Sequence, residues 1–228
     1  MAKNTDKTED RIVAVEEAFS KTEQWIEKNQ RIIIIVVSVV IVVVLGFFGF
    51  KRFYLAPKEK EAQAQMFMAE KYFEMDSISK ALNGDGNYPG FLTIIQDYGI
   101  TQSANLAHYY AGICYLKKSE YQKAIDQLED FKGKDEVVGP MATGAIGDCY
   151  MELNQADKAA EYYSKAAAQR KNDFTTPMLL MKAGYAYEIA GKKDEALKAY
   201  QQIKSDFSRS FEGRDIDKYI SKLSPVKK

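Results

Sequence analysis

The strongest hydrophobic pattern in the chain is an uninterrupted apolar run from Ile32 to Phe50. These 19 residues carry no charge and are almost all Ile, Val, Leu, Phe or Gly. At about 1.5 Å of rise per residue, a helix of this length approaches the roughly 30 Å of bilayer hydrocarbon. A buried β-core would need turn residues within the run. The run therefore predicts one membrane-spanning helix in contact with lipid. Residues of this span are Ile32, Val36, Val40, Val44 and Phe48.

The flanks of this run fit the same interpretation. Lys28 and Arg31 precede it, and Lys51 and Arg52 follow it, so basic side chains stand where they can reach both interfaces. The run starts late and is too long for a cleaved secretory signal, which favours an uncleaved anchor. Lys and Arg residues are similarly numerous on both sides, so the positive-inside rule gives no orientation.

Helical patterns surround the predicted span. Residues 1–30 form a polar tail that includes an amphipathic helix with apolar residues at three- and four-residue steps, before a span assigned to residues 31–55. Pro57 predicts a break after the span, because the residue before a proline is pushed out of the helical region. In residues 56–100 we expect a helix over Lys58–Leu82, a turn at Asn83–Gly90, a short helix over Phe91–Tyr98, and together a degenerate first hairpin.

An internal repeat begins near Ser103. Three segments share a glycine, then an apolar or aromatic pattern at offsets of 3, 12 and 16 residues. Each segment predicts two helices joined by a short polar turn, in which small residues let the helix axes approach closely. The matching sets are Gly112, Tyr115, Ala124 and Leu128; Gly147, Tyr150, Ala159 and Tyr163; and Gly184, Tyr187, Ala196 and Tyr200.

This pattern resembles the tetratricopeptide repeat, a helical hairpin of about 34 residues that stacks into a solenoid. The position that usually holds tryptophan has His108, Thr143 and Leu180, and the closing proline is missing from each unit. The resemblance implies an all-α fold with one transmembrane helix followed by a tetratricopeptide-repeat α-solenoid. Three repeats are expected in residues 101–209, and a capping helix and tail in residues 210–228.

The composition argues against two functions, catalysis and nucleic-acid binding. The chain has 32 basic and 32 acidic side chains, whereas a nucleic-acid surface should be basic. His108 is the only histidine, and Cys114 and Cys149 lie inside helical patterns typical of small buried residues rather than a disulfide. No phosphate-binding loop, zinc-ligand spacing or catalytic set is found. We expect no enzyme activity, no cofactor, no metal site and no small-molecule substrate.

Binding of protein partners remains, through the concave face that stacked hairpins provide. By resemblance to the repeat family, the first helix of each hairpin supplies this face at fixed positions relative to its glycine. An adaptable groove rich in Met would suit segments of varied sequence, although the same side chains could instead pack neighbouring hairpins together. The predicted groove consists of Leu106, Tyr109, Ile113, Met141, Asp148, Met151, Met178, Met181 and Tyr185.

The layout of an N-terminal anchor followed at once by such repeats resembles the YfgM-type family of bacterial inner-membrane proteins, which are ancillary to the Sec translocon. That resemblance implies a single-pass protein with a cytoplasmic amino terminus and a periplasmic repeat domain. It implies translocon subunits, a periplasmic chaperone or emerging polypeptides as partners. Two alternatives stay open: a structural subunit of another secretion or envelope-biogenesis complex, and an anchored enzyme regulator with cytoplasmic repeats.

Overall fold

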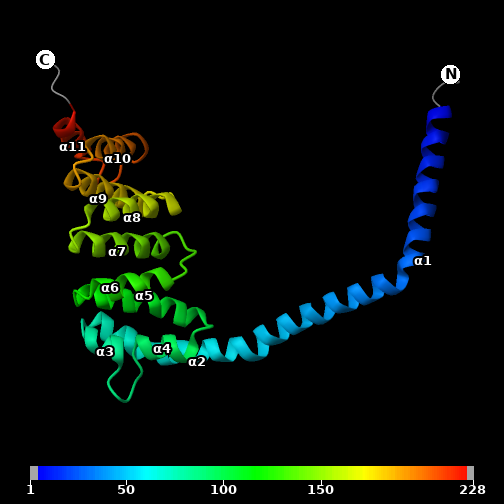
Figure 1. Cartoon of the computed structure of the whole chain (residues 1–228), viewed down its shortest axis with the longest axis horizontal. Coiled ribbons are helices and arrows are strands. Elements are labelled where there is room, and N and C mark those ends of the chain that lie inside the picture. Colours follow the sequence, from blue (N-terminus) through cyan, green and yellow to red (C-terminus); the bar gives the residue numbers. More distant parts are fainter. Residues whose placement is uncertain (1–4, 225–228) are drawn as a thin grey trace. The chain divides into compact units, whose positions relative to one another are not determined.

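The computed structural model describes residues 5–224, and from residue 25 onward it describes their side chains as well. Every regular element in this part is helical, which confirms the predicted all-α class (Figure 1). The chain divides at Pro57 into two compact units. The elements are α1 (Thr5–Gly49), η1 (Phe50–Leu55), α2 (Ala56–Glu74), α3 (Ile78–Asn83), α4 (Phe91–Tyr98), α5 (Gln102–Lys117), α6 (Tyr121–Asp130), α7 (Val138–Glu152), α8 (Ala156–Gln169), α9 (Thr175–Ile189), α10 (Lys193–Asp206) and α11 (Ile216–Leu223).

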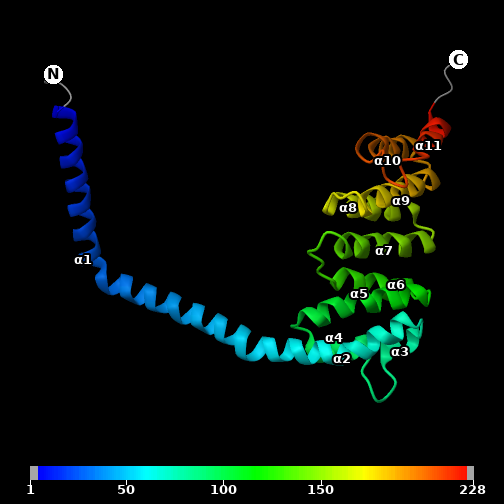
Figure 2. The same cartoon turned by 180° about the vertical axis from the view of Figure 1, so that it is seen from behind.

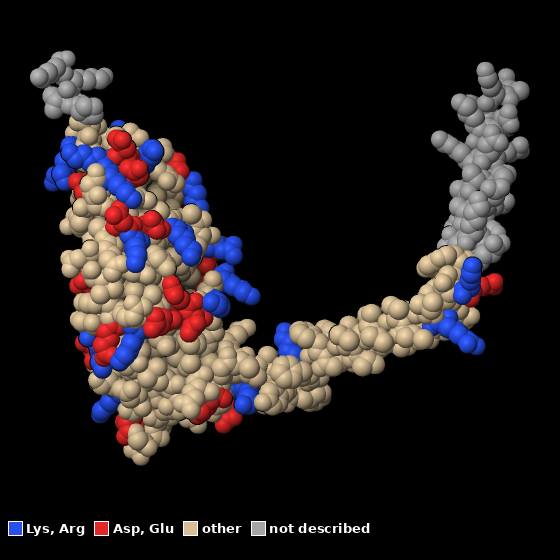
Figure 3. Space-filling view, in the orientation of Figure 1, with Lys and Arg blue, Asp and Glu red and all other residues tan. Residues whose placement is uncertain are grey.

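The first unit is built on α1, one continuous helix that contains the predicted span up to Gly49, and the last residues of that span, 50–55, form η1. Its apolar part is long and apolar enough to cross a membrane, and none of that part is buried inside the described chain. Figure 3 shows this stretch without charged side chains, between basic residues at its two ends. The amphipathic face predicted before the span lies outside the residues whose side chains are described.

The predicted break at Pro57 is wrong. The backbone stays helical from α1 into α2 through η1, a π-helix in which the Ala56 amide donates to the Lys51 carbonyl five residues back. An α-helix would have to place the proline ring against the carbonyl of Phe53, whereas the wider π turn relaxes that crowding. The proline is therefore accommodated by a local change of helix type, and no loop separates the elements.

The second unit begins with a hairpin that differs from the prediction. The helix expected over Lys58–Leu82 ends at Glu74, because Asp76 adopts a left-handed backbone with φ of 56°. The returning helix is split into α3 and α4 by the turn-rich segment that was predicted at Asn83–Gly90. Ala69, Tyr72 and Ala81 repeat the 0, 3 and 12 offsets of the later hairpins and are buried, so α2 and α3 form the first degenerate repeat.

Three regular hairpins follow, α5 with α6, α7 with α8, and α9 with α10, and they stack in chain order (Figures 1 and 2). The short helix α11 packs on α10 at the end of the stack. Adjacent hairpins share core residues: Met151 of α7 packs against the buried cluster formed by α8, α9 and α10. The predicted solenoid is therefore confirmed, with each hairpin burying its apolar face on its neighbour.

The repeat glycines are explained by the closeness of the two helices in each hairpin. A Cβ on Gly184 would lie 2.3 Å from the Tyr200 ring, and one on Gly147 would lie 2.7 Å from the Tyr163 ring. In the first regular hairpin, a Cβ on Gly112 would lie 2.5 Å from the Leu128 side chain. The residue at offset 16 thus packs where the glycine has no side chain, which confirms the predicted close approach of the two helices.

The turns inside the hairpins are also repeated. The amide of Glu120 donates to the Tyr115 carbonyl, and Gln155 and Lys192 make the same bond to Tyr150 and Tyr187. One residue in each turn has positive φ: Ser119, Asn154 and Gly191. In the α2–α3 turn the Ser77 amide likewise donates to the Tyr72 carbonyl, and Asp76 has the positive φ. This turn therefore has the same structure as the turns of the three regular hairpins. The aromatic residue at offset 3 therefore supplies, in every hairpin, the carbonyl that accepts the hydrogen bond closing the turn.

Candidate protein-binding surface

The nine residues of the predicted groove occupy a common stripe on α5, α7 and α9. Relative to the repeat glycine they stand at positions −6, −3, +1 and +4, which fall on one side of a helix. Eight of them are half-buried, and Tyr185 is 58% exposed. The stripe is therefore neither a closed core nor a free surface, and its side chains contact both their own hairpin and solvent.

The structure does not gather the nine residues into one pocket. Met151, Met178 and Met181 pack against the same buried cluster, and so come together across the α7 and α9 helices. Tyr109 and Ile113 pack against a second cluster, while Leu106 packs against a third. The groove thus consists of consecutive patches along the stack.

A hollow of about 670 Å³ lies at the α5 end of the stripe. Leu106, Met66 and Phe131 provide apolar walls, and the backbone of the α6–α7 loop closes one side. Glu59 of α2 spans part of the rim, where its carboxylate accepts hydrogen bonds from the Gln102 amide at 2.6 Å and from the Ser103 amide at 3.0 Å. The hollow joins apolar walls to donors and acceptors, a combination suited to a peptide segment.

Asp148 is the charged member of the stripe, and it joins two hairpins. Its carboxylate accepts hydrogen bonds from the Tyr163 hydroxyl of α8 at 2.6 Å and from Lys182 Nζ of α9 at 2.7 and 3.0 Å. Burial and the neighbouring carboxylate raise the pKa of Tyr163. Both oxygens of the Asp148 carboxylate are therefore bonded within the protein, and Asp148 connects the α7–α8 hairpin to α9.

The same arrangement recurs one hairpin later. Glu188 of α9 accepts from the Tyr200 hydroxyl at 2.8 Å and from Lys222 Nζ of α11 at 2.6 Å. Burial raises the pKa of Glu188, but the hydrogen bonds from Lys222 and Tyr200 outweigh it and leave the pKa below its ordinary value. In both cases a carboxylate accepts a hydrogen bond from the tyrosine of its own hairpin and forms an ion pair with a lysine of a later helix in the stack.

A second hollow, of about 450 Å³, borders Asp148 and Met151. The α5–α6 turn contributes Ser119, and α6 begins with Tyr121. The end of α7 contributes Glu152, whose carboxylate accepts a hydrogen bond from the Tyr121 hydroxyl at 3.2 Å. Two predicted residues therefore do share a cavity wall. The stripe is thus hollowed here, between the end of α7 and the preceding hairpin.

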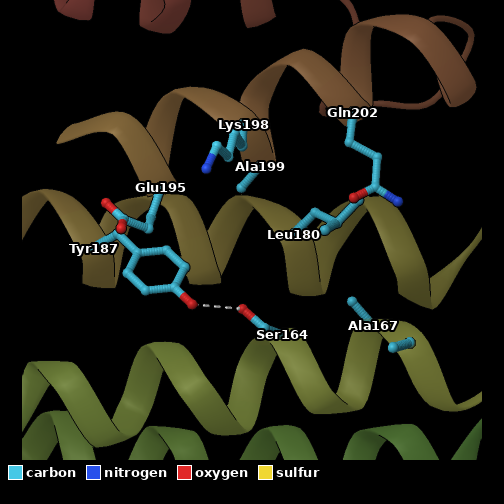
Figure 4. Close-up of a pocket in the computed structure, with 9 residues that line it drawn as sticks. Ser164, Ala167, Leu180, Tyr187, Glu195, Lys198, Ala199 and Gln202 are labelled. Atoms are coloured by element: carbon cyan, nitrogen blue, oxygen red, sulfur yellow. Dashed lines mark hydrogen bonds between the residues drawn. The ribbon is translucent and has the colours of Figure 1, made fainter. Parts of the chain in front are cut away.

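The second helices of the hairpins carry a separate hollow of about 260 Å³ (Figure 4). It lies between α8 and α10, with Leu180 and Tyr187 of α9 beneath it, and the Tyr187 hydroxyl is 3.3 Å from Ser164 Oγ. Its other lining residues are Ala167, Ala168 and Ala199 and the polar side chains of Glu195, Lys198 and Gln202. None of the nine predicted residues lines this hollow, so it is distinct from the groove.

His108 and the two cysteines each lie in contacts between helices. His108 Nδ1 lies 2.9 Å from Gln127 Oε1, a contact that ties α5 to α6. Cys114 and Cys149 are buried free thiols, and burial raises the pKa of each to about 12. Among the described side chains no group of three or more His, Cys, Asp or Glu residues could hold a metal ion. The chemistry of this surface is contact and hydrogen bonding.

Comparison with known proteins identifies the repeat. Residues 145–172 and 179–210 match the tetratricopeptide repeat family. The fold is similar to two crystal structures of "Podosopora anserina putative kinesin light chain nearly identical TPR-like repeats", one of them a point-substitution variant. The variant has a TM-score of 0.54 and 14% sequence identity, and the match covers 72% of this chain and 85% of that chain. The second structure has a TM-score of 0.54 and 13% identity, and the match covers 72% of this chain and 86% of that chain. No curated protein sequence matches this chain significantly.

These findings define the class of the molecule. It is an all-helical solenoid of tetratricopeptide-like hairpins, preceded by one helix apolar enough to span a membrane. Repeats of this class form scaffolds for protein–protein interaction, so the partners are proteins in general.

Proposed function

We propose that this chain is a non-enzymatic scaffold, anchored in a membrane by α1, that binds protein partners through the predicted groove. The observation that carries the proposal is the partial exposure of that stripe. Its large side chains, Tyr185 above all, remain accessible although neighbouring residues of the same helices are fully buried. Met side chains adapt to ligands of different shape, so a groove lined by Met141, Met151, Met178 and Met181 suits varied sequences.

The finer assignment rests on the layout of anchor and repeats. We place the protein in a bacterial inner membrane as a single-pass, YfgM-type subunit beside the Sec translocon, with its amino terminus in the cytoplasm and its repeats in the periplasm. There the groove would receive emerging polypeptides or a periplasmic chaperone. Support comes from the order of elements, since α2, the first helix of the repeats, follows the apolar helix without an intervening loop.

Partner capture by the full chain tests the groove. Tyr185→Glu and Met141→Glu place charge on two side chains that are not part of the buried clusters, so the hairpins should fold normally. We expect both variants to lose most crosslinking to nascent chains and chaperones in membranes, with unchanged helical content by circular dichroism.

The matched control is Met75→Glu, since Met75 is 61% exposed and lies outside the stripe. Equal crosslinking by all three variants would contradict the groove. Contacts limited to fixed neighbours, with no nascent chains, would favour the alternative of an assembly subunit. Protease digestion of the repeats in intact and opened cells tests the orientation, because periplasmic repeats must be cleaved once the outer barrier alone is removed.

A further inference from the structure

Four exposed apolar side chains recur at a constant interval along the solenoid. Ile100, Val137, Phe174 and Phe211 are each separated by 37 residues. Their exposed fractions are 55%, 43%, 76% and 80%. Each lies in the connection that leads from one hairpin to the next first helix, before α5, α7, α9 and α11. We call these four residues the apolar row.

These connections lie side by side along one edge. Asn105 of α5 accepts from the Lys132 amide in the α6–α7 connection at 2.8 Å. Asn172 in the α8–α9 connection donates to the Glu136 carbonyl at 2.9 Å, and Lys171 reaches Asp206 at the end of α10 at 2.8 Å. The α6–α7 and α8–α9 connections are therefore bonded to each other, and each is also bonded to a helix end of the neighbouring hairpin. In Figure 1 they form the edge of the stack opposite the hairpin turns.

The backbone that presents the apolar row is fixed. Thr101 Oγ1 accepts from the Ala104 amide and caps α5. Asp135 accepts from the Val137 and Val138 amides, and Asn172 accepts from the Phe174 and Thr175 amides. The exposed side chains thus project from ordered loops, and little conformational entropy is lost when something covers them.

The opposite edge lacks such a row. Its turns present Lys118 and Ser119, Asn154 and Gln155, and Gly191 and Lys192. Met75 and Ile189 are 61% and 53% exposed there, but the turns of the two hairpins between them have no large exposed apolar side chain. Exposed apolar side chains therefore recur at every connection of one edge, whereas at the other edge they occur only at the first and last turns.

We propose that the apolar row inserts into the interfacial region of the lipid bilayer that holds α1. This inference rests on the membrane anchoring in the proposed function. An anchor in the same chain keeps the repeats at a high local concentration next to the bilayer, so a few shallow side chains are enough for docking.

The side chains around the row fit a lipid interface better than a protein core. Each of the last three connections adds two exposed basic residues, and such side chains suit an interface with lipid phosphates. They are Lys132, Lys134, Arg170, Lys171, Arg209 and Arg214. Three of them also bond within the protein, Lys171 to Asp206 and Lys132 and Arg170 to backbone carbonyls. Nearby acidic residues nearly balance them, so apolar insertion and not net charge drives the docking.

A fluorescent probe beside the row tests this. In the full chain, Asp173→Cys places one exposed thiol next to Phe174, and Lys193→Cys places one on the opposite edge. The buried native thiols have pKa values of about 12 and should not react, so each variant takes one label. Both proteins are reconstituted in phosphatidylcholine–phosphatidylglycerol vesicles that carry a spin-labelled lipid quencher. We expect quenching at 173 to exceed that at 193 by about threefold.

The second variant removes the two most exposed members of the row. Phe174→Ser with Phe211→Ser, in the Asp173→Cys background, changes only exposed side chains and should abolish the excess quenching. Equal quenching at the two edges, or excess quenching that survives the double substitution, overturns the inference. Crosslinks between copies at position 173 without lipid quenching would overturn it in favour of a second chain. Carbonate extraction and partner capture are measured on the same samples, so failure of the anchor or groove is seen separately.

Discussion

Asp148 on α7 and Lys182 on α9 form an ion pair between consecutive hairpins, with Nζ at 2.7 and 3.0 Å from the two carboxylate oxygens. The pair is partly shielded, since the side chains are 34% and 39% exposed, and the Tyr163 hydroxyl completes it. Because solenoid stability is a sum of hairpin and interface contributions, this contact should affect how strongly the last hairpins hold together.

We predict that Asp148→Asn and Lys182→Met each lower the free energy of unfolding by about 1 kcal/mol, and that the double variant loses less than the sum. The measurement is denaturant unfolding of all three proteins. Asp157→Asn is the control, because its pair with Lys192 also crosses between hairpins but is 61% and 45% exposed. Purely additive losses at 148 and 182 would show that the pair contributes no coupling.

Substitution of a repeat glycine should be costly. Gly184→Ala would bring a Cβ to 2.3 Å from the buried Tyr200 ring, which is 0% exposed and cannot swing away. We expect a loss of about 1–3 kcal/mol from overpacking, measured by thermal or denaturant unfolding. Gly46→Ala in α1 is the matched helical control, since nothing lies within 4 Å of its new Cβ. A neutral Gly184→Ala would refute the close approach of α9 and α10.

The pairing of Glu188 with Lys222 predicts acid release of α11. The pKa of Glu188 is lowered from 4.5, so the carboxylate stabilises the folded state fully above that pH, and this stabilisation is lost as pH falls through the lower folded pKa. Hydrogen exchange of the α11 amides should therefore accelerate below pH 4.5, after correction for intrinsic rates. Glu188→Gln should already exchange faster at neutral pH and show little further change in acid. Lys222→Met should behave like Glu188→Gln, and a wild-type acid response in either variant would contradict the assignment.

Glu59 holds the start of the first regular hairpin to α2. Its carboxylate bonds the amides of Gln102 and Ser103 and also the Ser103 hydroxyl, so it caps α5 from another helix. Glu59→Ala should cost about 0.5–2 kcal/mol, as for loss of a helix cap, with faster exchange of the first α5 amides. Glu59→Gln keeps a neutral acceptor and should fall between wild type and Glu59→Ala. Equal exchange in all three proteins would rule the cap out.

Much of the fold follows from local rules that a sequence displays. The glycine and aromatic offsets encode contacts within one hairpin, and those contacts are found at Gly112, Gly147 and Gly184. The continuity through Pro57 was missed because a π turn relieves the proline without any compositional sign. The end of α2 was missed because an aspartate such as Asp76 is a weaker sign of a left-handed backbone than a glycine such as Gly191. Asn and Asp do adopt that conformation more readily than most other residues.

The candidate surface was harder to predict than the fold. Asp148 was assigned to the groove by its position, but its partners Tyr163 and Lys182 come from two other helices. Which side chains meet there depends on the angle between hairpins, and residue spacing within one repeat does not contain that angle. The apolar row, in contrast, was visible in principle, since the interval from Ile100 to Phe211 is regular in the sequence itself.

Both thiols of the chain are sealed inside helix contacts, with Cys114 and Cys149 each 0% exposed and on different helices, α5 and α7. The repeats consequently mature without an oxidant and have no crosslink that a reductant could open. Because neither thiol is paired or accessible, a change of redox conditions leaves the contacts of α5 and α7 as they are.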